Sequence, residues 1–242
     1  MTPTDRARVA RSRADDDRVG MITHVTERAP SRPNPRLFIA VPLPEDARRD
    51  VEQLVDAVRA DLQGVLANPP AAAEARRRDR RTGSDVRWVR MDGLHLTLRF
   101  LGSTAADRLS ELSALVDDVA STAAPFEVVL AGAGAFPSVS RPRTLWIGLA
   151  QGTSELAELA RQVETRAGAL GFPRDERPFR SHLTLGRADG RSEGPVAARS
   201  LRERARGFRA PFQAGRIVLF ESVTGGGPAR YVPLHEARLG AR

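Results

Sequence analysis

"LHLTL" at residues 94–98 and "HLTL" at residues 182–185 are two copies of one short pattern in a chain of 242 residues. The chain has four histidines, and two of them begin these copies. Side chains on a β-strand alternate between its two faces, so His95 and Thr97 share one face while the leucines beside them share the other. Each copy therefore predicts a strand that presents an imidazole and a hydroxyl together.

The elements around the two copies repeat in one order: strand, helix, HLTL strand, helix, strand. Apolar residues at helical spacing predict helices at 45–66, 104–122, 153–171 and 195–208. Alternating or β-branched runs predict strands at 36–44, from 94 onward, and at 125–138, 143–150, 178–189, 213–222 and 229–239. The repeated order predicts an α+β fold with an internal duplication. The two HLTL strands would then be related by a pseudo-two-fold axis and line opposite walls of one cleft.

The predicted domain organisation is a disordered tail at 1–35 followed by a single bilobal domain at 36–242. Residues 67–85 contain a block of arginines without apolar periodicity, which predicts a flexible surface loop. The net charge of +8 lies mostly in two stretches, 1–36 with +3 and 74–90 with +4. The folded body is therefore expected to be close to neutral, so the charge alone does not indicate a basic nucleic-acid-binding face.

Composition removes several classes of protein. The chain has no cysteine, which excludes disulfides, thiolate nucleophiles and cysteine-based zinc sites. It has no run of about eighteen apolar residues, and its N-terminus lacks the apolar core of a signal peptide. We therefore expect a cytoplasmic protein without a membrane segment, and we expect a monomer.

The paired motifs suit displacement at a phosphodiester. The attacking oxygen must lose a proton and the departing oxygen must gain one, so the reaction needs one base and one acid. Histidine, with an ordinary pKa near 6.5, can be either at neutral pH. Thr97 and Thr184 can donate hydrogen bonds to the non-bridging phosphate oxygens. The scheme needs no metal or other cofactor, and the H-x-T pattern supplies too few ligands to indicate a metal site.

These motifs, together with "RLFIAVPLP", "FPSVSRPRTLWIGL" and "VLFES" in the same order, resemble the two-histidine phosphoesterases. Within them the chain is similar to the RNA 2′,3′-cyclic phosphodiesterases once called 2′-5′ RNA ligases. The resemblance runs from about Arg36 to Leu239. It implies two antiparallel sheets that face a central cleft with helices outside. It also implies hydrolysis of cyclic phosphate ends to 2′-phosphomonoesters, with His95 as proton donor and His182 as the base that activates water. Reverse 2′-5′ joining is implied as a side activity.

Four further residues are candidates for substrate binding. Arg187 matches an arginine of the second motif in relatives and would clamp the phosphate. Arg180 and Arg99 lie on the predicted faces of His182 and Thr97, where salt bridges are an equal alternative. Phe38 occupies a place where relatives stack a terminal base, with core packing as the alternative.

The expected partner is RNA with a 2′,3′-cyclic phosphate end, tRNA fragments included. One alternative keeps the chemistry and changes the substrate to a small cyclic nucleotide or an ADP-ribose cyclic phosphate. The other is a catalytically silent RNA-binding module, in which the arginine-rich segments grip the RNA backbone and the histidines are structural.

Overall fold

The computed structural model describes residues 34–67, 86–188, 193–225 and 227–241. The predicted tail at 1–35 and the predicted loop at 67–85 lie almost entirely outside the described residues. None of the helices in the described part of the chain has both the length and the apolar character needed to cross a bilayer.

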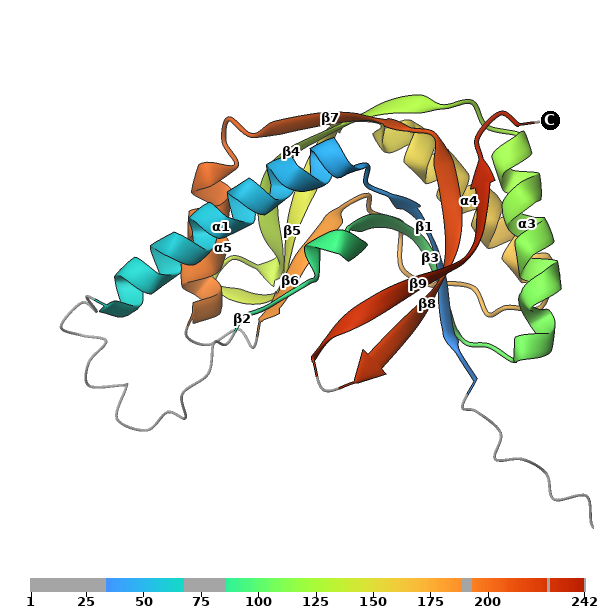
Figure 1. The fold of residues 1–242 in the computed structure, drawn as a ribbon, viewed down its shortest axis with the longest axis horizontal. Coiled ribbons are helices and arrows are strands. Elements are labelled where there is room, and N and C mark those ends of the chain that lie inside the picture. Colours follow the sequence, from blue (N-terminus) through green and yellow to red (C-terminus); the bar gives the residue numbers. More distant parts are fainter. Residues whose placement is uncertain (1–33, 68–85, 189–192, 226, 242) are drawn as a thin grey trace, which may run out of the picture. The chain divides into compact units, whose positions relative to one another are not determined.

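The described part of the chain combines helices and 3-10 turns with strands (Figure 1). The helices are α1 (Glu45–Ala67), α3 (Leu109–Ser121), α4 (Thr153–Ala169) and α5 (Glu193–Arg204), and the 3-10 turns are η1 (Met91–Gly93) and η2 (Ala106–Arg108). The strands are β1 (Arg36–Pro42), β2 (Val86–Trp88), β3 (His95–Ser103), β4 (Phe126–Ser138), β5 (Arg141–Gln151), β6 (Leu183–Ala188), β7 (Arg209–Ala214), β8 (Arg216–Gly225) and β9 (Gly227–Arg238).

The strands form one sheet in the order β7-β4-β5-β6-β3-β1-β8-β9, and β2 pairs with β6. The two HLTL strands, β3 and β6, meet in the middle of this order at one residue pair. The predicted pair of sheets is therefore joined into a single sheet with two halves. The order is symmetric about β3 and β6 when β1 is matched with β5 and β8 with β4, as the repeated elements require. The internal duplication itself stays an interpretation.

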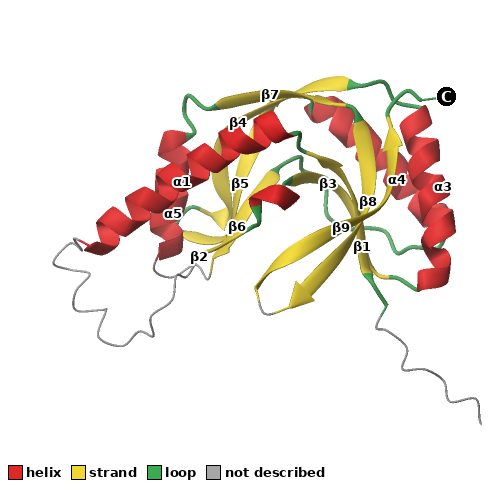
Figure 2. Ribbon diagram, viewed as in Figure 1, coloured by secondary structure: helices red, strands yellow, loops and turns green. Residues whose placement is uncertain are grey.

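The helices pack in two pairs at opposite ends of the sheet. Helix α1 lies beside α5, and α3 lies beside α4 (Figures 1 and 2). Apolar residues of α1 such as Val51, Val55 and Val58 have no exposed surface. Burying one such side chain stabilises the fold by about 1.5–3 kcal/mol. Each half of the sheet is thus fixed from its helix-covered face, and its other face is left to carry polar side chains.

The predicted helices and most strands are confirmed within a few residues, and the α+β class is confirmed. Strand β7, "RAPFQA", was missed because the predicted helix ran to residue 208 and the next strand began at 213. Its alternating burial is that of a half-covered strand. It is the terminal strand of the sheet, where Pro211 is tolerated because an edge strand has backbone N–H groups without ladder partners.

Candidate active site

The register between β3 and β6 brings the two motifs together. The strands run antiparallel and place Leu96 opposite Leu183. One residue to either side, the histidine of each motif therefore lies opposite the threonine of the other. The resulting pairs are His95 with Thr184 and His182 with Thr97. The two histidines are then diagonal neighbours across the strand pair, a position in which Cα atoms lie roughly 7–8 Å apart.

Burial separates the two faces of the motifs as the alternation predicts. The four motif leucines are buried, with 6% or less of each exposed. The histidines and threonines are half-buried. All four polar side chains thus share one partly open face of the sheet, the face opposite the leucine core.

Both imidazoles are held by the same backbone hydrogen bond. Nδ1 of His95 lies 2.7 Å from the carbonyl oxygen of Gly93, and Nδ1 of His182 lies 2.7 Å from the carbonyl oxygen of Arg180. A carbonyl only accepts, so Nδ1 carries the proton in each ring. Nε2 of each neutral ring is then unprotonated, and neither Nε2 has a hydrogen-bond partner among the described residues. Both rings are therefore ready to exchange a proton at Nε2.

Aromatic rings surround His95. Phe38 lies 4.7 Å from the imidazole between ring centroids, and Tyr231 contacts it edge-on at 4.8 Å. Phe220 stacks on Phe38 at 5.2 Å. This burial lowers the pKa of His95 below its ordinary value of 6.5, and the bond to Gly93 opposes the shift only in part. The surroundings therefore favour the neutral imidazole in the free protein.

The second histidine has a different neighbourhood. Phe136 meets the ring of His182 edge-on at 5.3 Å and lies beside Trp146. Trp146 pairs with Thr184 across β5 and β6, which puts the indole on the face of the motif. The two imidazoles thus share their anchoring bond but not their surroundings.

A β-bulge follows the threonine in each motif. Ala40 pairs with Thr97 but Ile39 pairs with Arg99, so Leu98 is the extra residue in β3. In β6 the register likewise skips Leu185. A bulge shifts the alternation by one residue, which moves the following side chains to the opposite face.

The bulge in β3 corrects the prediction for Arg99. Its side chain leaves the face of Thr97 and is 5% exposed. The guanidinium donates to the carbonyl oxygen of Pro173 at 2.6 Å and forms an ion pair with Glu164. The Arg99 side chain therefore links β3 to α4 through its ion pair, and it is too buried to bind RNA.

The same shift places the fifth residue after each histidine on the motif face, whereas simple alternation would place it on the other face. These residues are Phe100 in β3 and Arg187 in β6. Arg187 is exposed and donates to the hydroxyl of Thr144 at 2.8 Å. Burial raises the pKa of the Tyr231 phenol, and the positive charge of Arg187 partly offsets the rise.

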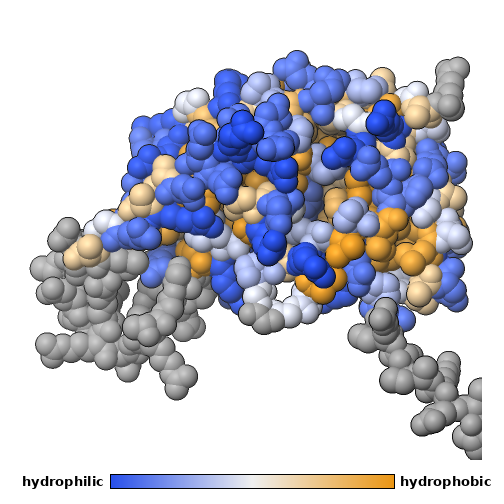
Figure 3. All heavy atoms as spheres, in the orientation of Figure 1, coloured by the Kyte–Doolittle hydropathy of each residue, from blue (hydrophilic) through white to orange (hydrophobic). Residues whose placement is uncertain are grey.

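Phe38 does not offer a ring face to RNA. It is 1% exposed and packs against the imidazole of His95, which agrees with the core-packing alternative. Phe100, which sequence reasoning did not single out, is 59% exposed and lies 5.8 Å from Phe38. Apolar surface gathers over this half of the sheet (Figure 3). The Arg180 side chain is exposed, and its role stays a prediction.

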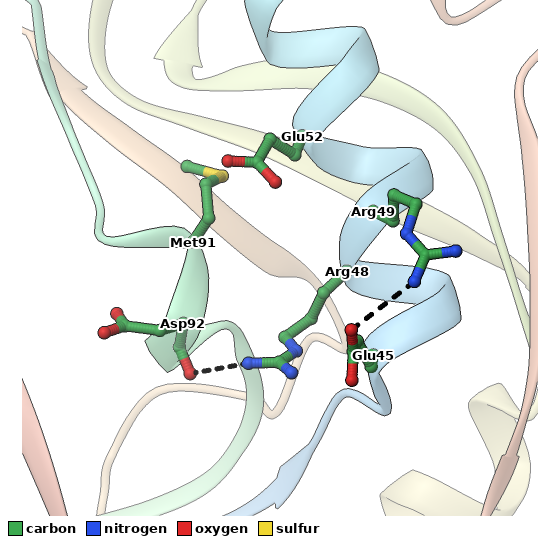
Figure 4. Close-up of a pocket in the computed structure, with 6 residues that line it drawn as sticks. All are labelled: Glu45, Arg48, Arg49, Glu52, Met91 and Asp92. Carbon is green, nitrogen blue, oxygen red and sulfur yellow. Dashed lines mark hydrogen bonds and ion pairs between the residues drawn. The ribbon is translucent and has the colours of Figure 1, made fainter.

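A pocket between α1 and η1 lies behind the turn that holds His95 (Figure 4). Arg48 donates to the carbonyl oxygen of Asp92 at 3.3 Å, and Arg49 pairs with Glu45. The pocket contains none of the motif side chains. Within the described ranges no group of three or more His, Asp or Glu side chains is arranged to hold a metal ion.

Comparisons with known proteins show the family of the chain. A family model described as the 2′-5′ RNA ligase superfamily matches residues 67–226. A relative from Archaeoglobus fulgidus named RNA 2′,3′-cyclic phosphodiesterase is 34% identical over 152 residues, 63% of this chain and 72% of that protein. A relative of the same name from Escherichia coli is 29% identical over 82% of this chain and 93% of its own length. The crystal structure of E. coli LigT complexed with 3′-AMP aligns with a TM-score of 0.61 and 26% identity, over 86% of this chain and 99% of that one.

Proposed function

The chain belongs to the 2′-5′ RNA ligase superfamily, and on this premise we propose that it hydrolyses RNA 2′,3′-cyclic phosphodiester ends to 2′-phosphomonoesters. Relatives named for this activity align over most of their length. The observation that carries the proposal is the antiparallel register of β3 and β6, which sets each histidine opposite the threonine of the other motif. A phosphate seated on this face meets an imidazole from each strand.

In the proposed reaction His182 is the base and His95 the acid. Nε2 of His182 takes a proton from water, and the water oxygen forms a bond to phosphorus. The bond from phosphorus to the 3′ oxygen breaks, and that oxygen takes the proton from Nε2 of His95. The products are a 2′-phosphate and a 3′-hydroxyl. Proton exchange with solvent then returns both rings to their starting states, so one water is consumed and no cofactor is required.

The threonines and Arg187 would hold the reacting group. Thr97 and Thr184 flank the histidines on the same face, and each hydroxyl can donate to a non-bridging oxygen whose charge grows in the transition state. Arg187 lies further along β6 and adds a charge-assisted donor. The reverse joining of ends to a 2′-5′ linkage uses the same groups in the opposite sense, and it stays a prediction.

The acid role sets a condition on His95. Its lowered pKa favours the neutral ring in the free protein, whereas an acid must be protonated. An anionic phosphate beside the ring favours the imidazolium and so opposes the effect of burial. Substrate binding should therefore raise the pKa of His95, and the proton it gains is the one that the 3′ oxygen receives.

The test is product analysis with an oligonucleotide that ends in a 2′,3′-cyclic phosphate. We expect a 2′-phosphate end from the native protein. His95→Ala and His182→Ala should each lower the rate by roughly 100- to 10,000-fold, the usual contribution of one proton transfer. His235→Ala is the matched control, because this ring bonds Asp117 of α3 and lies outside the motifs. A 3′-phosphate product, or full activity in either motif variant, would contradict the proposal.

A further inference from the structure

Two arginines lie directly opposite each other beside the site. Arg87 of β2 pairs with Arg187 of β6 in the antiparallel ladder. Like charges in this position repel and destabilise the strand pair. Among the described residues neither guanidinium has an acidic partner, and Arg187 has only the hydroxyl of Thr144. Within the described ranges the pair is therefore a double positive charge without an acidic partner, which an anion would stabilise.

The burial of the neighbouring side chains shows which face of the sheet the pair occupies. In β2, Val86 is 3% exposed, and Trp88 receives the guanidinium of Arg59 from α1 at 5.5 Å from its ring centroid. Both neighbours of Arg87 thus point to the helix side. Arg87, between them, points to the opposite face and is exposed.

The ladder to β5 shows that this is also the face of the motifs. Arg187 pairs with Thr144 and Thr184 pairs with Trp146. Thr144 and Trp146 are two residues apart on one strand and so share a face. Strand β2 pairs with β6 on the edge opposite β5, which is the edge that β3 also uses further along β6. The two arginines therefore continue the motif face outward from the histidines.

Their distance from the histidines suits a second phosphate. Arg187 follows Thr184 by three residues, one of them in the bulge, which separates the two by roughly 7–10 Å along the strand. Arg87 lies beside Arg187 at the same level, on the edge of β6 that β3 also uses. The threonines already supply donors to the phosphate between the histidines. Guanidinium groups bind phosphate through paired N–H donors, so Arg87 matches the next phosphate of an RNA chain, and Arg187 lies between that phosphate and the reacting one.

We propose that Arg87, with Arg187 shared between the two phosphates, binds the phosphodiester on the 5′ side of the terminal nucleotide and so selects oligonucleotide ends over mononucleotide cyclic phosphates. This inference rests on the proposed function. It assigns a role to Arg87 and names the part of the substrate that distinguishes RNA from a small cyclic nucleotide.

The experiment compares three substrates by kcat/KM. The first is an oligonucleotide with a 2′,3′-cyclic phosphate end, the second is the same oligonucleotide with a neutral methylphosphonate at the last linkage, and the third is a nucleoside 2′,3′-cyclic monophosphate. The variants are Arg87→Gln and a matched control, Arg199→Gln, which removes an exposed arginine from helix α5.

We expect Arg87→Gln to lower the preference for the oligonucleotide over the mononucleotide by roughly tenfold, the usual scale for one charge-assisted contact. The methylphosphonate should cost the native protein a similar factor and cost Arg87→Gln much less. The dependence of log KM on log salt should become shallower by about 0.7, the value for one lost contact to a single strand. Arg199→Gln should keep the native preference.

The outcomes separate this inference from the proposed function. Equal losses on all three substrates in Arg87→Gln, or an unchanged preference, would overturn the second-phosphate site while hydrolysis by the native protein still stands. If the native protein hydrolyses none of the three substrates, the proposed function itself is wrong.

Discussion

Replacing Gly93 by alanine tests how the turn before β3 positions His95. A β-carbon at position 93 would lie 2.8 Å from Cδ2 of Tyr231, closer than real side-chain contacts allow. Either the phenol ring or turn η1 must move. Both hold the same imidazole, Tyr231 by its edge-on contact and Gly93 by the carbonyl that accepts from Nδ1.

The size of the effect follows from these two contacts. Overpacking at a closely packed site costs about 1–3 kcal/mol of unfolding free energy. Displacing a catalytic group by about 1 Å costs on the order of 100-fold in rate. We therefore expect Gly93→Ala to lose roughly 100-fold in kcat/KM on a cyclic-phosphate oligonucleotide while it still folds at 25 °C. Urea unfolding and initial rates, measured on the same preparation, give both numbers.

The matched control is Gly207→Ala, because a β-carbon there meets no atom within 4 Å. It should keep native activity. A second check removes the obstacle: in a Tyr231→Ala background, the added methyl group of Gly93→Ala should have little further effect. The reasoning is refuted if Gly93→Ala keeps its rate within about threefold of native, a change too small for a displaced acid.

Three further predictions concern the ion pair of Arg99 with Glu164, the pH dependence of stability, and the effect of a metal chelator on the rate. Arg99→Met leaves Glu164 without its partner and should cost about 2–4 kcal/mol of unfolding free energy, with kcat/KM within about tenfold of native; a large loss of activity with native stability would restore Arg99 to the site. Because the folded pKa of His95 lies below 6.5, the unfolded chain binds more protons just below pH 6.5 and stability should fall as the pH falls through this range. His95→Gln should flatten this fall in a series of urea titrations, and an unchanged slope would contradict the burial of the ring. Addition of EDTA should leave the hydrolysis rate unchanged, and activity that returns only on adding a divalent metal would contradict the acid–base scheme.

The motifs could be predicted from the sequence because they depend only on local alternation. His95 with Thr97, and His182 with Thr184, share a face for that reason, and the leucines between them supply the buried side. The helices could also be predicted from the sequence, because the apolar stripe that includes Val51, Val55 and Val58 is visible without knowing what the helix packs against.

The rest depends on pairing between strands, which a single sequence does not reveal. The bulge at Leu98 has no adjacent glycine or proline to mark it, and Gly186 beside Leu185 does not by itself indicate a bulge. Yet the two bulges decide that Arg99 is buried and that Arg187 faces the site. The pairing of β2 with β6, which sets Arg87 beside Arg187, joins segments about a hundred positions apart. The burial of Phe38 likewise depends on Phe220 from a distant strand.

The most direct test of the account is a titration of the native protein with a nucleoside 2′-monophosphate, followed by the ¹⁵N signals of the imidazoles. Signals are assigned with the His95→Ala and His182→Ala variants. If one phosphate lies between the two rings, the Nε2 signals of both should shift along the same saturation curve, and His95 should gain a proton. A response from only one ring, or two curves with different midpoints, would show that the histidines do not serve a common site.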